Sequence, residues 1–307
     1  MKLRQLIEKE YELKITKWHD DDLLETDAGK KRIYHWNDQQ QLEWHIKWRE
    51  SCRPTIDVMI NRMIRTKSGA THISFEEGWV SLHDEVTTLY PMEGHEAKWA
   101  LLIGEMLASG KQWAEEFRES DAPIMTSIEQ ITSKVDEIVQ LDEVARLVLK
   151  RSCVEAKNRM AAAERLKKAE DDQPLPLMDP FVSLTQAKQI YNVMLWQATT
   201  KRPERGYRSI RLFLEQWLYE NGEESLENLI TVLHRHIDLT GQQGELILSE
   251  CLQPWELDDC LKKLEETRTS AEGLAQFEVF QQRWETSRKL VLLLSRWIDN
   301  ERKKVAT

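Results

Sequence analysis

The sequence changes character near residue 90, and this change limits the folds open to the chain. Before that point, short segments rich in β-branched and aromatic residues are separated by glycine-bearing turns. These turns are Asp27-Ala28-Gly29, Lys67-Ser68-Gly69 and Glu76-Glu77-Gly78. After Tyr90 to Gly94 the strand signals stop and helical periodicity takes over. The sequence therefore predicts an α+β fold, with a small antiparallel β-rich region at 1–90 and a large, mainly helical region at 91–307.

Within the first region, the segments on either side of Asp27 to Gly29 predict a β-hairpin. A short helix over Leu3 to Tyr11 precedes it. The pattern of Leu42, His45, Ile46 and Trp48 after the hairpin indicates a second helix. We therefore expect an antiparallel sheet that carries at least one packed helix.

In the second region, apolar residues recur at spacings of three and four between Ile128 and Val148. They follow Thr126-x-x-Glu129, which fits a capping box, so we predict one helix here. Ala169 to Pro180 carries three prolines and is expected to be an exposed connection. Further helices are predicted at Leu184–Gln197, Ser209–Glu220, Ser225–His236, from Pro254 onward, and at Ser270–Lys304.

The formal net charge of −10 disfavours binding to nucleic acid or to an anionic membrane, since both surfaces repel an acidic protein. The best basic cluster runs from Lys201 through Arg202, Arg205 and Arg208 to Arg211, and we interpret it as a solvated face. The 12 tryptophans indicate core and inter-helix packing rather than ligand stacking.

The four cysteines form no C-x-x-C pair and have no histidine at zinc-finger spacing, so we expect no metal site. No apolar run approaches the roughly 20 residues that span a bilayer, and the N-terminus does not resemble a signal peptide. The expected compartment is the cytoplasm, with reduced thiols. G-x-S-x-G, H-E-x-x-H, Walker and G-x-G-x-x-G patterns are all absent from the sequence.

A small β lobe, a Pro/Gly-bearing hinge and a large helical lobe follow one another in protein-kinase-like folds. The stretch INRMIRTKSGATHISFEEGWVSLHDEVTTLYPMEG resembles the small lobe of the spore-coat S-like branch of the aminoglycoside phosphotransferase family, through Ile64 to Gly69 and Tyr90 to Gly94. ALLIGEMLASGKQ is similar to the helix after the hinge, and SIRLFLEQWL and LQPWELDDCLKKL to later helices. The resemblance implies a two-lobed, kinase-like fold and a sporulation-associated role.

Phosphoryl transfer in such folds needs backbone donors over the phosphates, a strand lysine, a catalytic-loop Asp with a metal-binding Asn, and a metal-binding Asp. The first strand turn, His19 to Asp22, has no glycine, and its carboxylates repel phosphate. His35 stands where the resemblance places the strand lysine. Lys30 or Lys31 replaces it only with a register slip, which turns the side chain to the other face.

The stretch MDPFVSLTQAKQIYNVMLWQ takes the place of the catalytic loop and the strand after it. Asp179 then occupies the catalytic position, and Ser183 stands near the position of the metal-binding Asn. Leu195, before Trp196, stands where the metal-binding Asp belongs, and leucine offers magnesium no oxygen ligand. This placement predicts a degenerate site.

A rival placement uses His236-Ile237-Asp238, followed by GELIL as a strand. It also lacks the metal-binding Asn. A helix C-terminus, where His234 to His236 complement the helix dipole before Gly241, explains the same residues.

The sequence thus predicts a catalytically inactive, pseudokinase-like cytoplasmic protein that binds a protein partner and holds no cofactor or metal. Asp179 and Asp238 are its candidate catalytic residues, and His35 and Leu195 are degenerate cofactor positions. Two alternatives remain open: an active small-molecule phosphotransferase with an atypical site around Asp179 or Asp238, and a helical scaffold unrelated to kinases. A structure without a five-stranded antiparallel sheet packed on one helix favours the scaffold.

Overall fold

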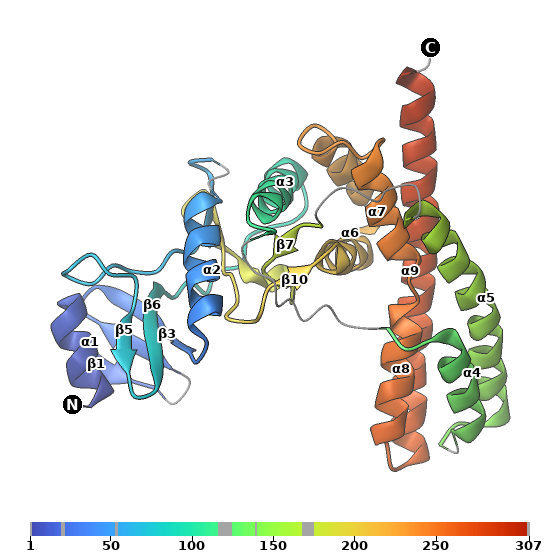
Figure 1. The fold of residues 1–307 in the computed structure, drawn as a ribbon, viewed down its shortest axis with the longest axis horizontal. Helices are drawn as coiled ribbons and strands as arrows, with labels where there is room; N and C mark the ends of the chain where they lie inside the picture. The colour runs from blue at the N-terminus through green and yellow to red at the C-terminus, as the bar shows by residue number, and fades with distance from the viewer. Residues whose placement is uncertain are drawn as a thin grey trace. The chain divides into compact units, whose positions relative to one another are not determined.

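The structure, a computed structural model, describes residues 2–19, 22–52, 55–115, 125–138, 140–167 and 175–305. The chain forms two compact units (Figure 1). The first comprises Met1–Asp121 and Pro174–Ser209, and the second comprises Ala122–Gln173 and Ile210–Thr307. The first unit therefore unites the β-rich region with the segment around Asp179. The lobe boundary at residue 90 remains a prediction.

The first unit contains a five-stranded antiparallel sheet with the strand order β1-β2-β3-β6-β5. Its strands are β1 (Ile15–Trp18), β2 (Leu23–Thr26), β3 (Gly29–Trp36), β5 (Ile73–Phe75) and β6 (Gly78–Asp84). The β2–β3 hairpin pairs Thr26 with Gly29 across a two-residue turn, and Gly29 has a φ of 89°, which glycine tolerates best. The predicted hairpin is confirmed.

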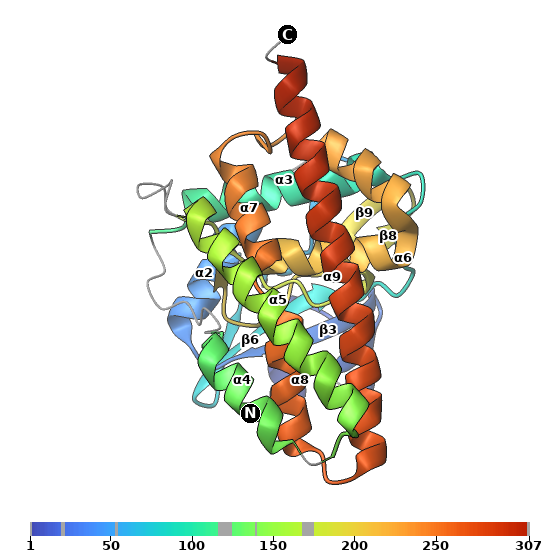
Figure 2. The ribbon, with the colours of Figure 1, turned by 90° about the vertical axis from the view of Figure 1, so that its right-hand side faces the viewer.

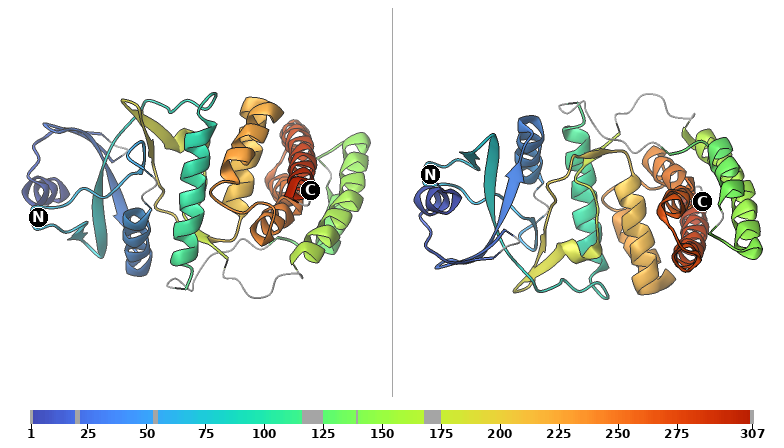
Figure 3. Two further views of the ribbon diagram at one scale, coloured as in Figure 1. Left: turned by 90° about the horizontal axis from the view of Figure 1, so that it is seen from above. Right: turned by 90° about the horizontal axis from the view of Figure 1, so that it is seen from below.

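Two helices cover opposite faces of this sheet (Figure 3). α1 (Leu3–Tyr11) packs Ile7 and Tyr11 against Leu24 and Ile33 of the strands. α2 (Gln39–Ser51) packs Leu42 on Trp36 and Met63 on the other face. Asp38 caps α2 because its carboxylate accepts a hydrogen bond of 3.1 Å from the Gln41 amide. The scaffold alternative is therefore wrong, since the five-stranded sheet and its packed helix are both present.

A second, three-stranded sheet lies in the same unit. It joins β4 (Val58–Ile60), β8 (Ala187–Ile190) and β9 (Val193–Trp196) in the order β4-β9-β8. β4 runs parallel to β9, while β8 and β9 form a hairpin. The helix predicted over Leu184–Gln197 is wrong beyond the short 3₁₀ turn at Leu184–Gln186. Tyr191, with a φ of 54°, and Asn192 make the hairpin turn.

β7 (Leu177–Met178) packs tightly on α3 (Glu96–Gln112) and pairs with β10 (Glu204–Arg205). A Cβ at Gly110 of α3 would lie 2.8 Å from the Leu177 carbonyl oxygen, so only glycine allows this approach. The predicted exposed connection over 169–180 lies outside the described residues up to Pro174. From Pro176 to Pro180 it is buried instead, because the chain enters the core beside α3.

The second unit is helical (Figure 2). Its helices are α4 (Ile128–Glu137), α5 (Glu143–Lys167), α6 (Arg208–Leu233, which begins in the first unit), α7 (Gln242–Leu252), α8 (Trp255–Glu266) and α9 (Ser270–Val305). The single helix predicted over Ile128–Val148 is wrong, since α4 ends at Glu137 and Asp142 starts α5 by accepting from the Ala145 amide at 2.8 Å. Ser127, not Thr126, caps α4. The GELIL segment is part of α7, not a strand.

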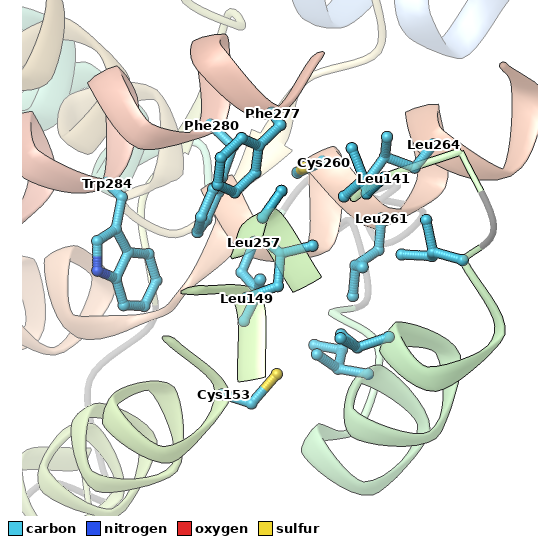
Figure 4. Close-up of a cluster of buried hydrophobic side chains, with 14 of the residues drawn as sticks. Leu141, Leu149, Cys153, Leu257, Cys260, Leu261, Leu264, Phe277, Phe280 and Trp284 are labelled. Atoms are coloured by element: carbon cyan, nitrogen blue, oxygen red, sulfur yellow. The ribbon is translucent and has the colours of Figure 1, made fainter. Parts of the chain in front are cut away.

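The apolar periodicity nevertheless located the core of the second unit (Figure 4). Ile131 and Val135 of α4 and Leu149 of α5 are fully buried against α8 and α9. Leu257 and Phe280 supply the opposite wall. Across both units nine of the 12 tryptophans are buried, which confirms the prediction that they pack the core. Within the described residues, no helix has the length and apolar character needed to cross a bilayer.

Candidate functional site

Asp179 directly follows β7 and is fully buried in the first unit. Its Oδ2 accepts a hydrogen bond of 2.9 Å from the Thr199 amide, and its Oδ1 accepts one of 2.6 Å from the Thr199 hydroxyl. Thr199 lies in the segment that leaves β9. The sequence-predicted catalytic residue is therefore enclosed, with one neutral donor on each carboxylate oxygen.

Arg49, on the last turn of α2, is the cation next to this carboxyl group. Its Nη1 donates to the Asn61 carbonyl at 3.1 Å and to Asn61 Oδ1 at 2.6 Å, and its Nη2 donates to the Thr199 carbonyl at 2.6 Å. Asn61 Oδ1 also accepts from the Ala198 amide at 3.0 Å. These bonds tie α2 and the segment after β4 to the chain that encloses Asp179.

Burial dominates the electrostatics of this cluster. It raises the pKa of Asp179 to about 6, although the Arg49 charge and the Thr199 hydrogen bonds act in the opposite direction. It also raises the pKa of the Tyr34 hydroxyl, whose ring lies 5.9 Å from the Arg49 guanidinium. Burial together with Arg49 lowers the pKa of His45 to about 3, so that this imidazole is neutral. Asp179 is thus the group of the cluster that titrates near neutral pH.

The positions expected to bind a metal carry no acid. Ser183 uses its hydroxyl to accept from the Thr185 amide and begin the 3₁₀ turn, and Leu184 is buried. Leu195 is buried in β9, and Gln197 beyond it donates to the Val86 carbonyl at 3.3 Å. In the described part of the chain, no group of three or more His, Cys, Asp or Glu side chains is placed to hold a metal ion.

The structure does not bring His35 to this cluster. His35 alternates with Tyr34 along β3, and it lies on the same face as Ile33, which packs under α1. Its Nε2 lies 3.3 Å from Asp22 Oδ2. Tyr34, on the α2 face, is the β3 residue beside Arg49.

The neighbouring cations of β3 are paired with acids. The Lys31 ammonium binds Asp84. The Arg32 guanidinium donates two hydrogen bonds to the Glu85 carboxylate, of 2.7 and 3.0 Å.

Asp238 lies in the second unit, in the turn between α6 and α7. Its Oδ1 accepts from the Thr240 hydroxyl at 2.7 Å, the Thr240 amide at 2.9 Å and the Gly241 amide at 3.1 Å. The hydrogen bond from the Thr240 hydroxyl holds the pKa of Asp238 below its usual value. These contacts are those of an Asx turn that starts a helix.

Sequence reasoning missed Arg49 and Thr199. Arg49 shares the buried face of α2 with Leu42 and His45, at helical spacings of three and four. That spacing is the one signal able to mark Arg49 as buried. The expected solvated cluster from Lys201 to Arg211 also needs correction, because Arg211 is fully buried in the second unit, where it is paired with Glu256.

The fold is that of the protein-kinase-like phosphotransferases, with an antiparallel N-terminal sheet and a large helical C-terminal part. The chain is similar over 98% of its length to 97% of an aminoglycoside phosphotransferase from Alicyclobacillus acidocaldarius subsp. acidocaldarius DSM 446, with a TM-score of 0.74 and 11% sequence identity. A spectinomycin phosphotransferase in complex with ADP and spectinomycin matches 96% of the chain with 97% of its own, at a TM-score of 0.60 and 9% identity.

A microcompartment-associated aminopropanol kinase is also similar, with a TM-score of 0.55, 11% identity, and coverage of 96% of this chain and 97% of its own. No family model matches the sequence, and no curated protein matches it. The likeness is therefore one of fold, and the chemistry has to be argued from the residues.

Proposed function

We propose that this protein is a catalytically inactive, kinase-like protein that acts by binding another protein. The observation that supports inactivity best is the state of Asp179, which is fully buried with both carboxylate oxygens occupied by Thr199. A catalytic base must reach the hydroxyl proton of its substrate within hydrogen-bonding distance. Asp179 instead joins two segments of the chain.

The metal positions support the same proposal. Magnesium takes hard oxygen ligands, and in protein kinases an Asn of the catalytic loop and an Asp of the following strand supply them. Here the corresponding stretch offers Ser183, which caps a turn, and Leu195, which is buried. In this stretch the carboxylate that the kinase pattern supplies is that of Asp179, and both of its oxygens already accept hydrogen bonds from Thr199.

The cation that neutralises the phosphates is also missing from its expected place. In protein kinases a strand lysine pairs with a glutamate of the neighbouring helix and holds the nucleotide. On β3 the ring of Tyr34 lies 5.9 Å from the guanidinium of Arg49 on α2, and that guanidinium is bonded to two backbone carbonyls. These bonds occupy Arg49 Nη1 and Nη2, so neither terminal nitrogen is available to hold a nucleotide as the strand lysine does.

Thermal unfolding with and without magnesium and ATP tests the inactive site. Because a ligand that binds the folded state alone raises the melting temperature, we expect no shift beyond that seen with magnesium and an equal concentration of sodium sulfate. A stabilisation of several degrees that requires both magnesium and ATP contradicts the proposal.

The exposed apolar side chains near β4, β8 and β9 support the protein-binding half. Met59, Ile190 and Tyr191 are 42, 37 and 92% exposed and line one largely apolar pocket. A photo-crosslinking amino acid at position 191, expressed in the native host, is expected to give a discrete protein adduct. The same amino acid in place of Tyr219, 60% exposed in the second unit, is the matched control. Equal labelling from both positions contradicts a partner at this face.

A sporulation-associated role is part of the proposal, and its support is the resemblance of Ile64 to Gly69 and Tyr90 to Gly94 to the spore-coat S-like branch. A fluorescent fusion followed through sporulation in the native host is expected to gather at the forming spore. Uniform fluorescence in the mother cell throughout contradicts that role.

An active phosphotransferase with an atypical site is the second candidate. It is favoured by the pKa of Asp179 near 6, which suits a general base at neutral pH, and by the fold shared with a spectinomycin phosphotransferase. Phosphate release from ATP, measured with a panel of amino-alcohol and aminoglycoside acceptors, decides between the two. Turnover that Asp179→Asn abolishes and Asp238→Asn leaves intact supports the active enzyme and contradicts inactivity.

A further inference from the structure

A small polar pocket opens in the first unit between α2 and the chain that links β4 to β5. Its volume is about 290 Å³, at the lower end of the range for small-molecule sites. Arg49 and Glu50 of α2 line one side, and Arg62, Arg65 and Thr71 line the other. We propose that this pocket binds the phosphate group of a phosphate monoester, at a place separate from the carboxylate of Asp179.

The charge of the pocket fits an anion. Three guanidinium groups and one carboxylate line it, and the carboxylate of Glu50 is already paired with Arg65. Arg49 also lies next to the Asp179 carboxyl group, so Arg62 supplies the charge of the lining that is not offset in this way, in a chain whose formal net charge is −10. Exposed arginines of an acidic protein commonly form ion pairs with nearby acids. Arg62, by contrast, forms no side-chain hydrogen bond or ion pair with any residue in the described ranges.

Arg49 gives the pocket a rigid wall. Its side chain is 1% exposed, and the carbonyl oxygens of Asn61 and Thr199 fix its two terminal nitrogens. The Nε–H of Arg49 remains a buried donor without a partner among the described residues. A buried donor left unpaired is unfavourable, so an acceptor at this place is favourable.

The chemistry of the lining residues favours a phosphate-like oxyanion over a halide or a single carboxylate. Guanidinium groups present several N–H donors in a fixed plane, which matches the multiple oxygens of a phosphate group. Arg62 and Arg65 flank the pocket from an extended segment, and the buried Arg49 closes it from the helix. The apolar side chains of Ile46 and Met63 also line the pocket, where they can contact the carbon that is bonded to the ester oxygen of the phosphate monoester. The volume accommodates one phosphate and a short substituent, not a nucleoside triphosphate.

Calorimetric titration of the intact chain with inorganic phosphate, phenyl phosphate, and a phosphoserine peptide beside its unphosphorylated form tests the site. Each titration is run at constant ionic strength set with sodium chloride. We expect saturable binding of the phosphorylated ligands and none of the unphosphorylated peptide. Tighter binding of the phosphopeptide than of phenyl phosphate assigns the phosphate to a protein partner, and the reverse order assigns it to a small molecule.

The decisive variant is Arg62→Gln, because Arg62 is exposed and bonds to no described side chain, so that folding is preserved. Its affinity for phosphate is expected to fall at least tenfold. Arg235→Gln, which removes an exposed arginine of the second unit, is the matched control and is expected to change nothing. Arg65→Gln removes one guanidinium of the pocket together with its ion pair to Glu50, and it is expected to weaken binding more than Arg62→Gln does.

Absence of saturable phosphate binding, or equal affinity in the wild type and Arg62→Gln, overturns the phosphate site. This outcome is independent of the nucleotide test. A magnesium- and ATP-dependent stabilisation that persists in Arg62→Gln contradicts the inactive site alone.

Discussion

Each unit of the molecule buries a cluster of charged side chains. The two clusters differ in the residues that bind the carboxylate oxygens. In the second unit, both oxygens of Glu256 are bound by arginines, Arg159 Nη1 at 2.9 Å and Arg211 Nη2 on the other side. In the first unit, both oxygens of Asp179 are bound by Thr199, a neutral residue. With neutral donors, desolvation prevails and raises the pKa of Asp179 to about 6.

In both clusters a cation keeps buried nitrogens without a hydrogen-bond partner among the described residues: Arg49 Nε in the first unit, and Arg211 Nε and Nη1 in the second. Arg159 donates to the carbonyls of Cys251 and Leu252 and to the Ser287 hydroxyl, and it lies 4.7 Å from the ring of Trp284. Through these hydrogen bonds and its ion pair with Glu256, Arg159 connects α5 to α7, α8 and α9. This cluster therefore has a structural role. The feature that marks the first cluster as a candidate site is the raised pKa of Asp179, whose two carboxylate oxygens accept hydrogen bonds from a neutral residue.

The largest expected effect follows from breaking the buried ion pairs of Glu256 in the second unit. Glu256→Gln leaves two buried arginines without their common anion, and we expect it to lower the free energy of unfolding by about 3–5 kcal/mol. Urea denaturation at pH 7 measures this. Glu227→Gln is the control, because it removes an exposed partner of Arg296, and its cost is expected to stay below about 1 kcal/mol. Equal costs for the two variants contradict the structural role of the Glu256 cluster.

The second prediction concerns the sign of the Asp179 titration. Its folded pKa, about 6, is higher than the ordinary aspartate value of 3.8, so the folded state binds the proton more tightly than the unfolded state. The wild type therefore loses stability relative to Asp179→Asn as the pH rises from 4 through 6. Two pKa units correspond to about 3 kcal/mol between pH 4 and pH 7. Unfolding of both proteins across this range measures the difference.

The variant comparison is needed because two histidines act in the opposite direction. Burial lowers the pKa of His45 to about 3 and lowers that of His83 as well, so both contribute stability that is lost as the pH falls below about 6.5. These contributions cancel when the wild type is compared with Asp179→Asn. A stability difference that is independent of pH contradicts the raised pKa of Asp179.

Local chemistry made part of the fold predictable. The β2–β3 hairpin was found because Asp27 to Gly29 determine their turn by themselves. The break between α4 and α5 was missed because the apolar spacing continues through Ile138 and Leu141, which are buried in the same core. The β8–β9 hairpin was read as a helix because its strands have only four residues each, too few for alternation to outweigh helical spacing.

The site was only half predictable for a related reason. Asp179 was found through its place in a short motif along the chain. Arg49 and Thr199, which surround it, are 150 positions apart, so only the folded chain brings them together. The burial of Arg49 and Arg211 is equally hidden, because an arginine in the sequence is read as a surface residue until its partners are known.

The smallest expected effect sharpens the contrast between neutral and charged donors. Thr199→Val keeps the shape of the side chain and removes the hydroxyl that donates to Asp179 Oδ1 at 2.6 Å. Because this bond is strongest to the ionised carboxylate, we expect a loss of about 2 kcal/mol at pH 8 and a smaller loss at pH 4. Thr286→Val, which removes a hydroxyl bonded to the Gln282 carbonyl on the exposed face of α9, is the control and should show no pH dependence. If Thr199→Val costs the same at both pH values, the carboxyl group of Asp179 does not change its charge between them. The distinction between a carboxylate with neutral donors and one with charged donors is then contradicted.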